Sequence, residues 1–156
     1  MPLTVTSPAF AANQRIPQQF SRDGGNMSPP LEWRDEPPGT RSYALIVEDP
    51  DAPSGMFRHW AAYDIPADVH RLTEGAGSRD QGVALQVAVN DFGNARYDGP
   101  QPPPGHGAHH YHFRLFALDV PSLDVPPGSD IEEVLEAAED HALAEADYVG
   151  TFERPS

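Results

Sequence analysis

Short apolar segments separated by proline and glycine make up most of the chain. Residues 43–47 form a nearly continuous apolar run, and residues 59–65 form another that ends at Pro66. Two further segments alternate with the period of two that is typical of strands. They are Val83, Leu85, Val87 and Val89 in the first, and Tyr111, Phe113, Leu115 and Ala117 against His110, His112 and Arg114 in the second. This pattern predicts antiparallel sheets packed as a sandwich or a barrel.

One segment near the C-terminal end has the pattern of a helix. The chain contains 18 prolines in 156 residues, about twice the usual ~5%, which excludes long helices over most of its length. Residues 129–146 contain neither proline nor glycine, and Ser129 and Glu132 have the spacing of a capping box. This segment therefore predicts a helix with two distinct faces. The apolar face carries Ile131, Val134, Leu135, Ala138 and Ala142, and the solvent face carries Glu132, Glu133, Glu136, Glu139 and Asp140.

Length and composition bound the fold and exclude several kinds of chemistry. The 156 residues correspond to about one average domain, without an internal repeat or a linker, so we expect a single domain over residues 1–156. All ten basic residues are arginine, and the chain has no lysine and no cysteine. The lack of cysteine excludes disulfides, a thiolate nucleophile and any cysteine-ligated zinc or iron–sulfur site.

The net charge of −14 makes nucleic acid and anionic membranes poor partners, because both are repelled at long range. Such an acidic, lysine-free composition fits a cytoplasm of high salt and fits GC-rich coding equally well. Residues 1–12 lack the basic region and the apolar run of a signal peptide. No stretch approaches the ~20 apolar residues of a membrane span. We therefore expect a cytoplasmic protein without stable membrane association.

Two carboxylates and a histidine form the first candidate site. The segment Glu48-Asp49-Pro50-Asp51 directly follows the apolar run 43–47, and His59 lies at the start of the next predicted strand. Aspartate and proline at this place are also ordinary turn formers. A hairpin between the two strands would nevertheless return His59 to the carboxylates, which raise the pKa of an imidazole and fix its tautomer.

The second candidate site is the proline- and glycine-rich stretch 97–113, which holds four of the seven histidines. Imidazole is a common metal ligand, but strand geometry places His110 and His112 on one face and His109 and Tyr111 on the other. The His-x-His pair is similar to the cupin signature, yet no glutamate follows it in residues 113–117. We therefore expect no metal site. His109 and Tyr111 share the apolar face and predict a polar pocket at its mouth.

These two stretches resemble the two signature regions of the phosphatidylethanolamine-binding protein family, also called Raf kinase inhibitor protein-like. The resemblance is closer to the shorter bacterial and archaeal branch, and it covers nearly the whole chain. Its residues are Asp49-Pro50-Asp51-Ala52-Pro53, His59-Trp60, Gly99-Pro100, Pro102-Pro103, Gly105 and His109-x-Tyr111. Further matching segments are Asp23 to Trp33, Asn90-Asp91-Phe92-Gly93 and Val149-Gly150-Thr151-Phe152.

The resemblance implies a β-sandwich of two antiparallel sheets with Greek-key connections and a C-terminal helix. It also implies a small pocket at one end that binds anions and phosphoryl head groups. Carried over position by position, the ligand-binding residues are Asp49, Asp51, His59, Gly99, Pro100, His109 and Tyr111. His110 stands where the family commonly has arginine, and no residue after Phe152 matches the C-terminal tyrosine element of eukaryotic members.

We expect a binding protein that holds a small anionic or phosphate-bearing ligand without a cofactor. His59, His109, Tyr111 and the backbone amides near Gly99 would donate hydrogen bonds to the ligand. Asp49 and Asp51 would orient the histidines or accept from an ammonium group on the ligand. The stretch 99–113 contains no acidic residue, so the pocket is locally neutral to positive in an acidic protein.

Two other functions compete with ligand binding. A buried histidine beside two carboxylates could act as the general base of a hydrolase or isomerase. No nucleophile elbow, Walker loop, dinucleotide fingerprint or His-Glu-x-x-His motif supports a named reaction. The family name also implies a protein that inhibits a kinase or a protease through its surface, and the resemblance allows a homodimer.

Overall fold

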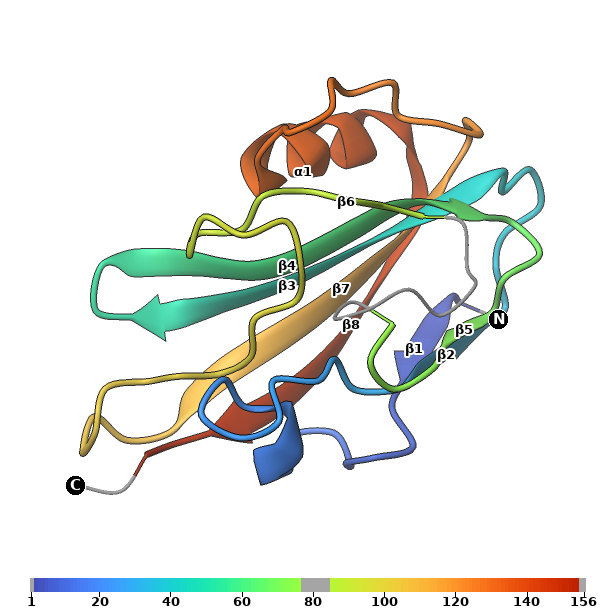
Figure 1. The fold of residues 1–156 in the computed structure, drawn as a ribbon. Coiled ribbons are helices and arrows are strands. Elements are labelled where there is room, and N and C mark those ends of the chain that lie inside the picture. Colours follow the sequence, from blue (N-terminus) through green and yellow to red (C-terminus); the bar gives the residue numbers. More distant parts are fainter. Residues whose placement is uncertain (1, 77–84, 155–156) are drawn as a thin grey trace.

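The computed structural model, which describes residues 2–76 and 85–154, contains two antiparallel sheets and, within these ranges, one α-helix (Figure 1). The five strands of the larger sheet have the order β6 (Gln86–Val87), β4 (Gly55–Pro66), β3 (Ser42–Ala52), β7 (His109–Leu118) and β8 (Ala142–Phe152). The smaller sheet has the order β1 (Thr4–Thr6), β2 (Leu31–Arg34) and β5 (Arg71–Leu72). The predicted fold class, two antiparallel sheets and a helix, is confirmed.

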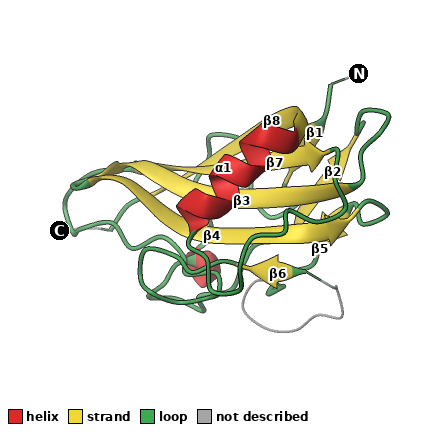
Figure 2. Ribbon diagram, turned by 90° about the horizontal axis from the view of Figure 1, so that it is seen from above, coloured by secondary structure: helices red, strands yellow, loops and turns green. Residues whose placement is uncertain are grey.

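Residues 42–49 of β3, the central strand of the larger sheet, are buried on both faces, which explains the continuous apolar run there. Leu45 and Val47 on β3 face the smaller sheet and share a core with Trp33. Ala44 and Ile46 point to the opposite face and pack beneath the helix α1 (Ile131–His141). Figure 2 shows α1 lying across this face of the sheet. The central strand β3 is therefore covered from two sides.

The strands β3 and β7 determine which side chains reach the end of the sandwich. On β7, His109 and Tyr111 are buried on the inner face, whereas His110 is exposed, as the alternation predicts. The strand β3 extends through Ala52, so the carboxylate motif lies within a strand rather than in the turn predicted for it. Register shifts on either side of the motif mark irregular pairing with β4.

The predicted helix is shorter than expected at both ends. Asp130, not Ser129, caps the helix, because its side chain accepts a hydrogen bond from the backbone N–H of Glu133 at 3.0 Å. The helix ends at His141, and residues 142–146 belong to β8 instead. They pair with residues 115–118 of β7, and this pairing overrides the helical propensity of the alanines. The acidic face of α1 is exposed, as predicted.

The alternating segment 83–89 forms less strand than predicted. Val83 lies outside the described residues, and the strand that pairs with β4 comprises Gln86 and Val87, followed by one hydrogen bond from Ala88 N–H to Ala61 O at 3.0 Å. Val89 instead forms a single bridge to Asp130 in front of α1. Among the described residues, no helix combines the length and the apolar character needed to span a membrane.

An N-terminal segment covers the outer edge of β8. The backbone N–H groups of Asn13 and Ile16 donate to the carbonyls of Val149 and Thr151, both at 2.7 Å. Between these carbonyls lies Gly150, where a Cβ would approach Ile16 Cγ1 to 2.5 Å. The absence of a side chain at this position lets the two segments meet, and the sheet edge nearest the C-terminus is closed.

Replacing the helix cap tests the revised helix boundary. We expect Asp130→Ala to lower the free energy of unfolding by about 1 kcal/mol, because the N–H of Glu133 loses its acceptor. Urea unfolding measures this change. Glu136→Ala, on the exposed face of α1, is the matched control and is expected to change stability by less than about 0.5 kcal/mol. Equal stability of the two variants would contradict the cap assignment.

Candidate functional site

A cavity of about 280 Å³ opens at the end of the sandwich where β3 ends and β7 begins. Antiparallel pairing of these strands brings Asp49 close to Tyr111, and the β3–β4 hairpin returns His59 to the same end. Four of the predicted residues line the cavity: Asp49, His59, His109 and Tyr111. The other lining residues are Ala52, Pro53, Ser54, Phe57, Phe92, Gln101, Pro102 and Pro103. The cavity therefore combines a polar group of side chains with largely apolar walls.

A buried carboxylate–imidazole pair forms one part of the site. His109 Nδ1 lies 2.6 Å from Asp49 Oδ2, and both side chains are almost fully buried. The other oxygen of Asp49 accepts a hydrogen bond from the backbone N–H of Asp51 at 2.8 Å. A carboxylate can only accept, so His109 Nδ1 carries a proton. The remaining nitrogen, Nε2, lies 2.6 Å from Nδ1 of His106, a residue that the sequence did not assign to the site.

The hydroxyl of Tyr111 is a buried hydrogen-bond donor in the cavity. Its oxygen is buried, and its geometry does not complete a hydrogen bond with any described residue, although the Asp49 carboxylate is close enough to interact with it. Burial, together with the nearby Asp49 carboxylate, raises the pKa of Tyr111 far above its ordinary value. The phenol therefore keeps its proton at every physiological pH. A buried O–H without an acceptor is costly, and a ligand oxygen in the cavity would satisfy it.

His59 presents a lone pair rather than the expected N–H group. Its Nδ1 lies 2.8 Å from the carbonyl oxygen of Asp98, so the proton is on Nδ1. Burial lowers the pKa of His59, and this effect exceeds the opposing influence of the Asp98 carbonyl and of Asp49. The neutral ring has only Nε2 left for a ligand, and that nitrogen is an acceptor. We therefore revise the expectation that His59 donates to the ligand.

Asp51, Gly99 and Pro100 lie outside the described lining of the cavity. Asp51 Oδ2 accepts from both the backbone N–H and the Nδ1 of His110, each at 2.8 Å. These bonds hold the pKa of Asp51 below its ordinary value. The N–H of Gly99 is buried and donates to Asn26 Oδ1 at 2.7 Å, which leaves it unavailable to a ligand. None of the three is therefore among the lining residues, and Asp51 and Gly99 use their polar groups within the protein.

The histidine cluster does not converge on one point. His110 and His112 face the outer surface of the larger sheet, opposite to His109, as predicted. His112 Nδ1 lies 2.8 Å from Asp147 Oδ2, so each outward histidine has its own carboxylate. Within residues 2–76 and 85–154, no group of three or more histidine, aspartate or glutamate side chains is arranged to hold a metal ion.

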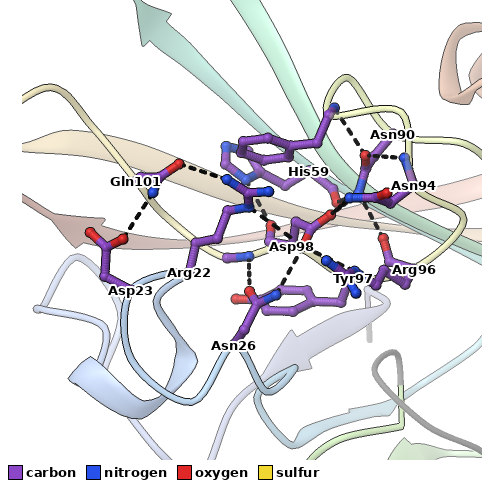
Figure 3. A network of polar contacts seen from close by, with 12 residues as sticks. Arg22, Asp23, Asn26, His59, Asn90, Asn94, Arg96, Tyr97, Asp98 and Gln101 are labelled. Atoms are coloured by element: carbon purple, nitrogen blue, oxygen red, sulfur yellow. Dashed lines mark hydrogen bonds and ion pairs between the residues drawn. The ribbon is translucent and has the colours of Figure 1, made fainter.

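A fully buried carboxylate, Asp98, organises the wall behind His59 (Figure 3). Its oxygens accept from the amides of Asn26, Asn90 and Asn94, each at 2.9 Å, and from Arg96 Nε at 3.1 Å. Burial alone would raise the pKa of Asp98, but the three amide donors outweigh burial and hold it below its ordinary value. Asp98 is therefore a fixed negative charge enclosed by donors.

Arg22 connects this network to the cavity wall. Its guanidinium carbon lies 4.1 Å from the ring centre of Phe92, and its Nη1 donates to Gln101 Oε1 at 3.0 Å. Both Phe92 and Gln101 line the cavity. Its Nε lies 3.7 Å from Asp98 Oδ1. The guanidinium thus holds one aromatic and one amide wall residue in place, as Figure 3 shows for Gln101.

Sequence reasoning missed Phe57, Phe92 and the role of Asp98. Phe57 could have been found, because it is two residues before His59 and therefore on the same face of β4. Phe92 lies in a loop, and its place in the wall depends on Arg22, 70 positions earlier in the sequence. Nothing in the sequence indicated that Asp98 is buried, since aspartate before glycine is typical of an exposed turn.

Comparison with known proteins gives a consistent result. The family model described as "Phosphatidylethanolamine-binding protein" matches residues 6–153. A UPF0098 protein of Aquifex aeolicus is 41% identical over 97% of this chain and 89% of its own. A UPF0098 protein of Methanothermobacter thermautotrophicus is 44% identical over 97% of this chain and 99% of its own. The crystal structure of E. coli YbcL is described as that of a new member of the mammalian PEBP family. Its superposition on this chain has a TM-score of 0.90 at 34% sequence identity, and it covers 98% of this chain and 99% of YbcL.

Removing the charge of Asp98 tests whether it holds this end of the molecule together. We expect Asp98→Asn to lower the free energy of unfolding at pH 7 by about 2–4 kcal/mol, because an amide group then faces amide donors. The folded-state pKa of Asp98 is depressed, so its stabilisation is present above the unfolded pKa and disappears as pH falls through the folded pKa. The stability gap between wild type and variant should therefore shrink in acid.

Urea unfolding at pH 7 and in acid measures both effects. Asp23→Asn is the matched control, because Asp23 is an exposed member of the same polar network. We expect this control to change stability by less than about 1 kcal/mol. A gap between wild type and Asp98→Asn that is constant with pH would contradict the assignment of an ionised Asp98.

Proposed function

Since this chain belongs to the phosphatidylethanolamine-binding protein family, we propose that its end cavity binds the oxyanion or phosphoryl group of a small ligand. The single observation that carries the proposal is the buried hydroxyl of Tyr111, a permanent donor for which the described residues, the nearby Asp49 included, offer no acceptor in good hydrogen-bond geometry. It lies among residues that the sequence had selected for this role, Asp49, His59 and His109. An anionic oxygen is the acceptor that forms the strongest hydrogen bond with such a donor.

Charge at the site is compatible with an anion although the whole chain carries −14. The carboxylate of Asp49 is already engaged by His109 and by the N–H of Asp51. The loop that leads into β7 contributes no acidic residue between positions 99 and 113. Phe57, Phe92 and the neighbouring prolines form walls against which an apolar substituent of the ligand can pack.

One contact supports binding over general-base hydrolysis. A general base must reach the proton that it abstracts, and in the Asp49–His109 pair that atom is His109 Nε2. This nitrogen is already in contact with His106 Nδ1, at 2.6 Å. Inhibition of a kinase or a protease, the homodimer and the cytoplasmic location stay predictions from the sequence, and affinity capture and sedimentation test the first two.

Isothermal titration with inorganic phosphate, phosphoethanolamine and nucleotides tests the proposed site. We expect Tyr111→Phe to weaken the binding of the preferred ligand about ten-fold or more, because one hydrogen bond to a charged oxygen is lost. His109→Ala should weaken binding as well. Tyr63→Phe is the matched control, since Tyr63 is a buried tyrosine on the helix-covered face of the sheet. Equal affinities of Tyr111→Phe and Tyr63→Phe would refute the site.

A further inference from the structure

Both ring nitrogens of His109 are occupied. Nδ1 binds Asp49 Oδ2, and Nε2 binds His106 Nδ1, each at 2.6 Å. An imidazole has no other polar atom. An anion in the cavity can therefore bind to His109 only by taking the place of His106 at Nε2.

The backbone of His106 is held in place, but its side chain can rotate away from His109. The residue is exposed, in contrast to the buried His109. It lies between Gly105 and Gly107, whose φ angles of 71° and 90° are in the left-handed region that favours glycine. The backbone is fixed by hydrogen bonds from Gly105 N to Arg154 O and from His106 N to Pro103 O, at 2.9 and 3.2 Å. A rotation of the side chain into solvent breaks one hydrogen bond and leaves these backbone bonds intact.

Hydrogen-bonding chemistry limits the proton positions in this chain of three side chains. Because Asp49 accepts, His109 Nδ1 donates. At Nε2, a neutral His109 accepts from His106 Nδ1, whereas a doubly protonated His109 donates to it, and the distance fits both arrangements. The other titratable or charged groups around the pair come from β3, β4, β7 and the segment after β8. They are Asp51, His59, His110, Tyr111 and Arg154, of which Arg154 is paired with Asp23.

We propose that His109 is neutral and that His106 is a latch on the binding site: it occupies Nε2 of His109, and an oxyanion displaces it only together with one proton. This inference rests on the proposed function, because it concerns how the same cavity takes up its ligand. A neutral His109 meets a ligand oxygen with a lone pair, so a proton is needed between them. The ligand either carries this proton itself, as a P–OH group, or His109 takes it from solvent.

The latch therefore makes the site selective for oxyanions that carry a proton. Inorganic phosphate retains at least one proton near neutral pH, whereas sulfate, of similar size and shape, carries none. Phosphate can replace the N–H of His106 with its own O–H and leave His109 neutral. Sulfate requires a protonated His109, so its affinity falls as pH rises and its binding consumes a proton from the buffer.

Titration calorimetry of phosphate and sulfate at about pH 8, in two buffers of different ionisation enthalpy, tests the latch. For the wild-type protein we expect tighter binding of phosphate than of sulfate. Sulfate should take up close to one proton per site and phosphate close to none. His106→Ala removes the competitor and should bind both anions about three- to ten-fold more tightly, the equivalent of one hydrogen bond. His112→Ala, which removes an outward-facing histidine of β7, is the matched control and should leave both affinities unchanged.

The outcomes separate the latch from the site itself. Weaker binding by His106→Ala would show that His106 contacts the ligand, and unchanged binding would show that it does not compete, so either result overturns the latch alone. Sulfate binding without proton uptake would overturn the proton coupling. If wild type and His106→Ala both fail to bind either anion, the proposed function falls, and the latch falls with it.

Discussion

The end of the molecule that carries the cavity depends on one buried charge, the carboxylate of Asp98. A carboxylate without exposure to water is strongly unfavourable unless donors surround it, and here three amides and Arg96 do so. Because these donors come from two separate loops, satisfying the charge fixes both loops against β4. The backbone carbonyl of the same residue orients His59. The position of the proton on His59, and with it the acceptor character of His59 Nε2, is therefore determined by Asp98.

The burial of β3 in the larger sheet also determines where the polar residues of the cavity lie. Leu45 and Val47 are buried because β3 lies between the smaller sheet and α1. Two residues beyond Val47 the same inward face carries Asp49, where the pairing of β3 with β4 becomes irregular. An inward position at the end of a buried strand has low exposure and an opening to solvent. The pair Asp49–His109 and the hydroxyl of Tyr111 occupy this environment.

Periodicity predicted the inner face of β7 and the central run of β3, since both signals are local and are produced by burial. It failed at Ala142, where a helix-forming sequence joins a strand because β7 offers it a ladder of hydrogen bonds. For the site, motif spacing found four lining residues and the structure removed Gly99 from the wall. His106 and Asp98 were beyond prediction, because their roles depend on partners brought close only by the folded chain. The local sequence pattern does not indicate which residues distant in sequence come into contact.

The covering of β8 by residues 13–16 has a consequence for the order in which the protein forms during synthesis. The hydroxyl of Tyr148 donates to the carbonyl of Phe10, 138 positions away, and among the described strands β8 is the last to emerge. β7, which carries His109 and Tyr111, needs β8 as its outer neighbour. A nascent chain therefore cannot complete the walls of the cavity before β8 has left the ribosome, and contacts between segments so distant in sequence form slowly. Synthesis of β8 is thus the step that allows the cavity to form.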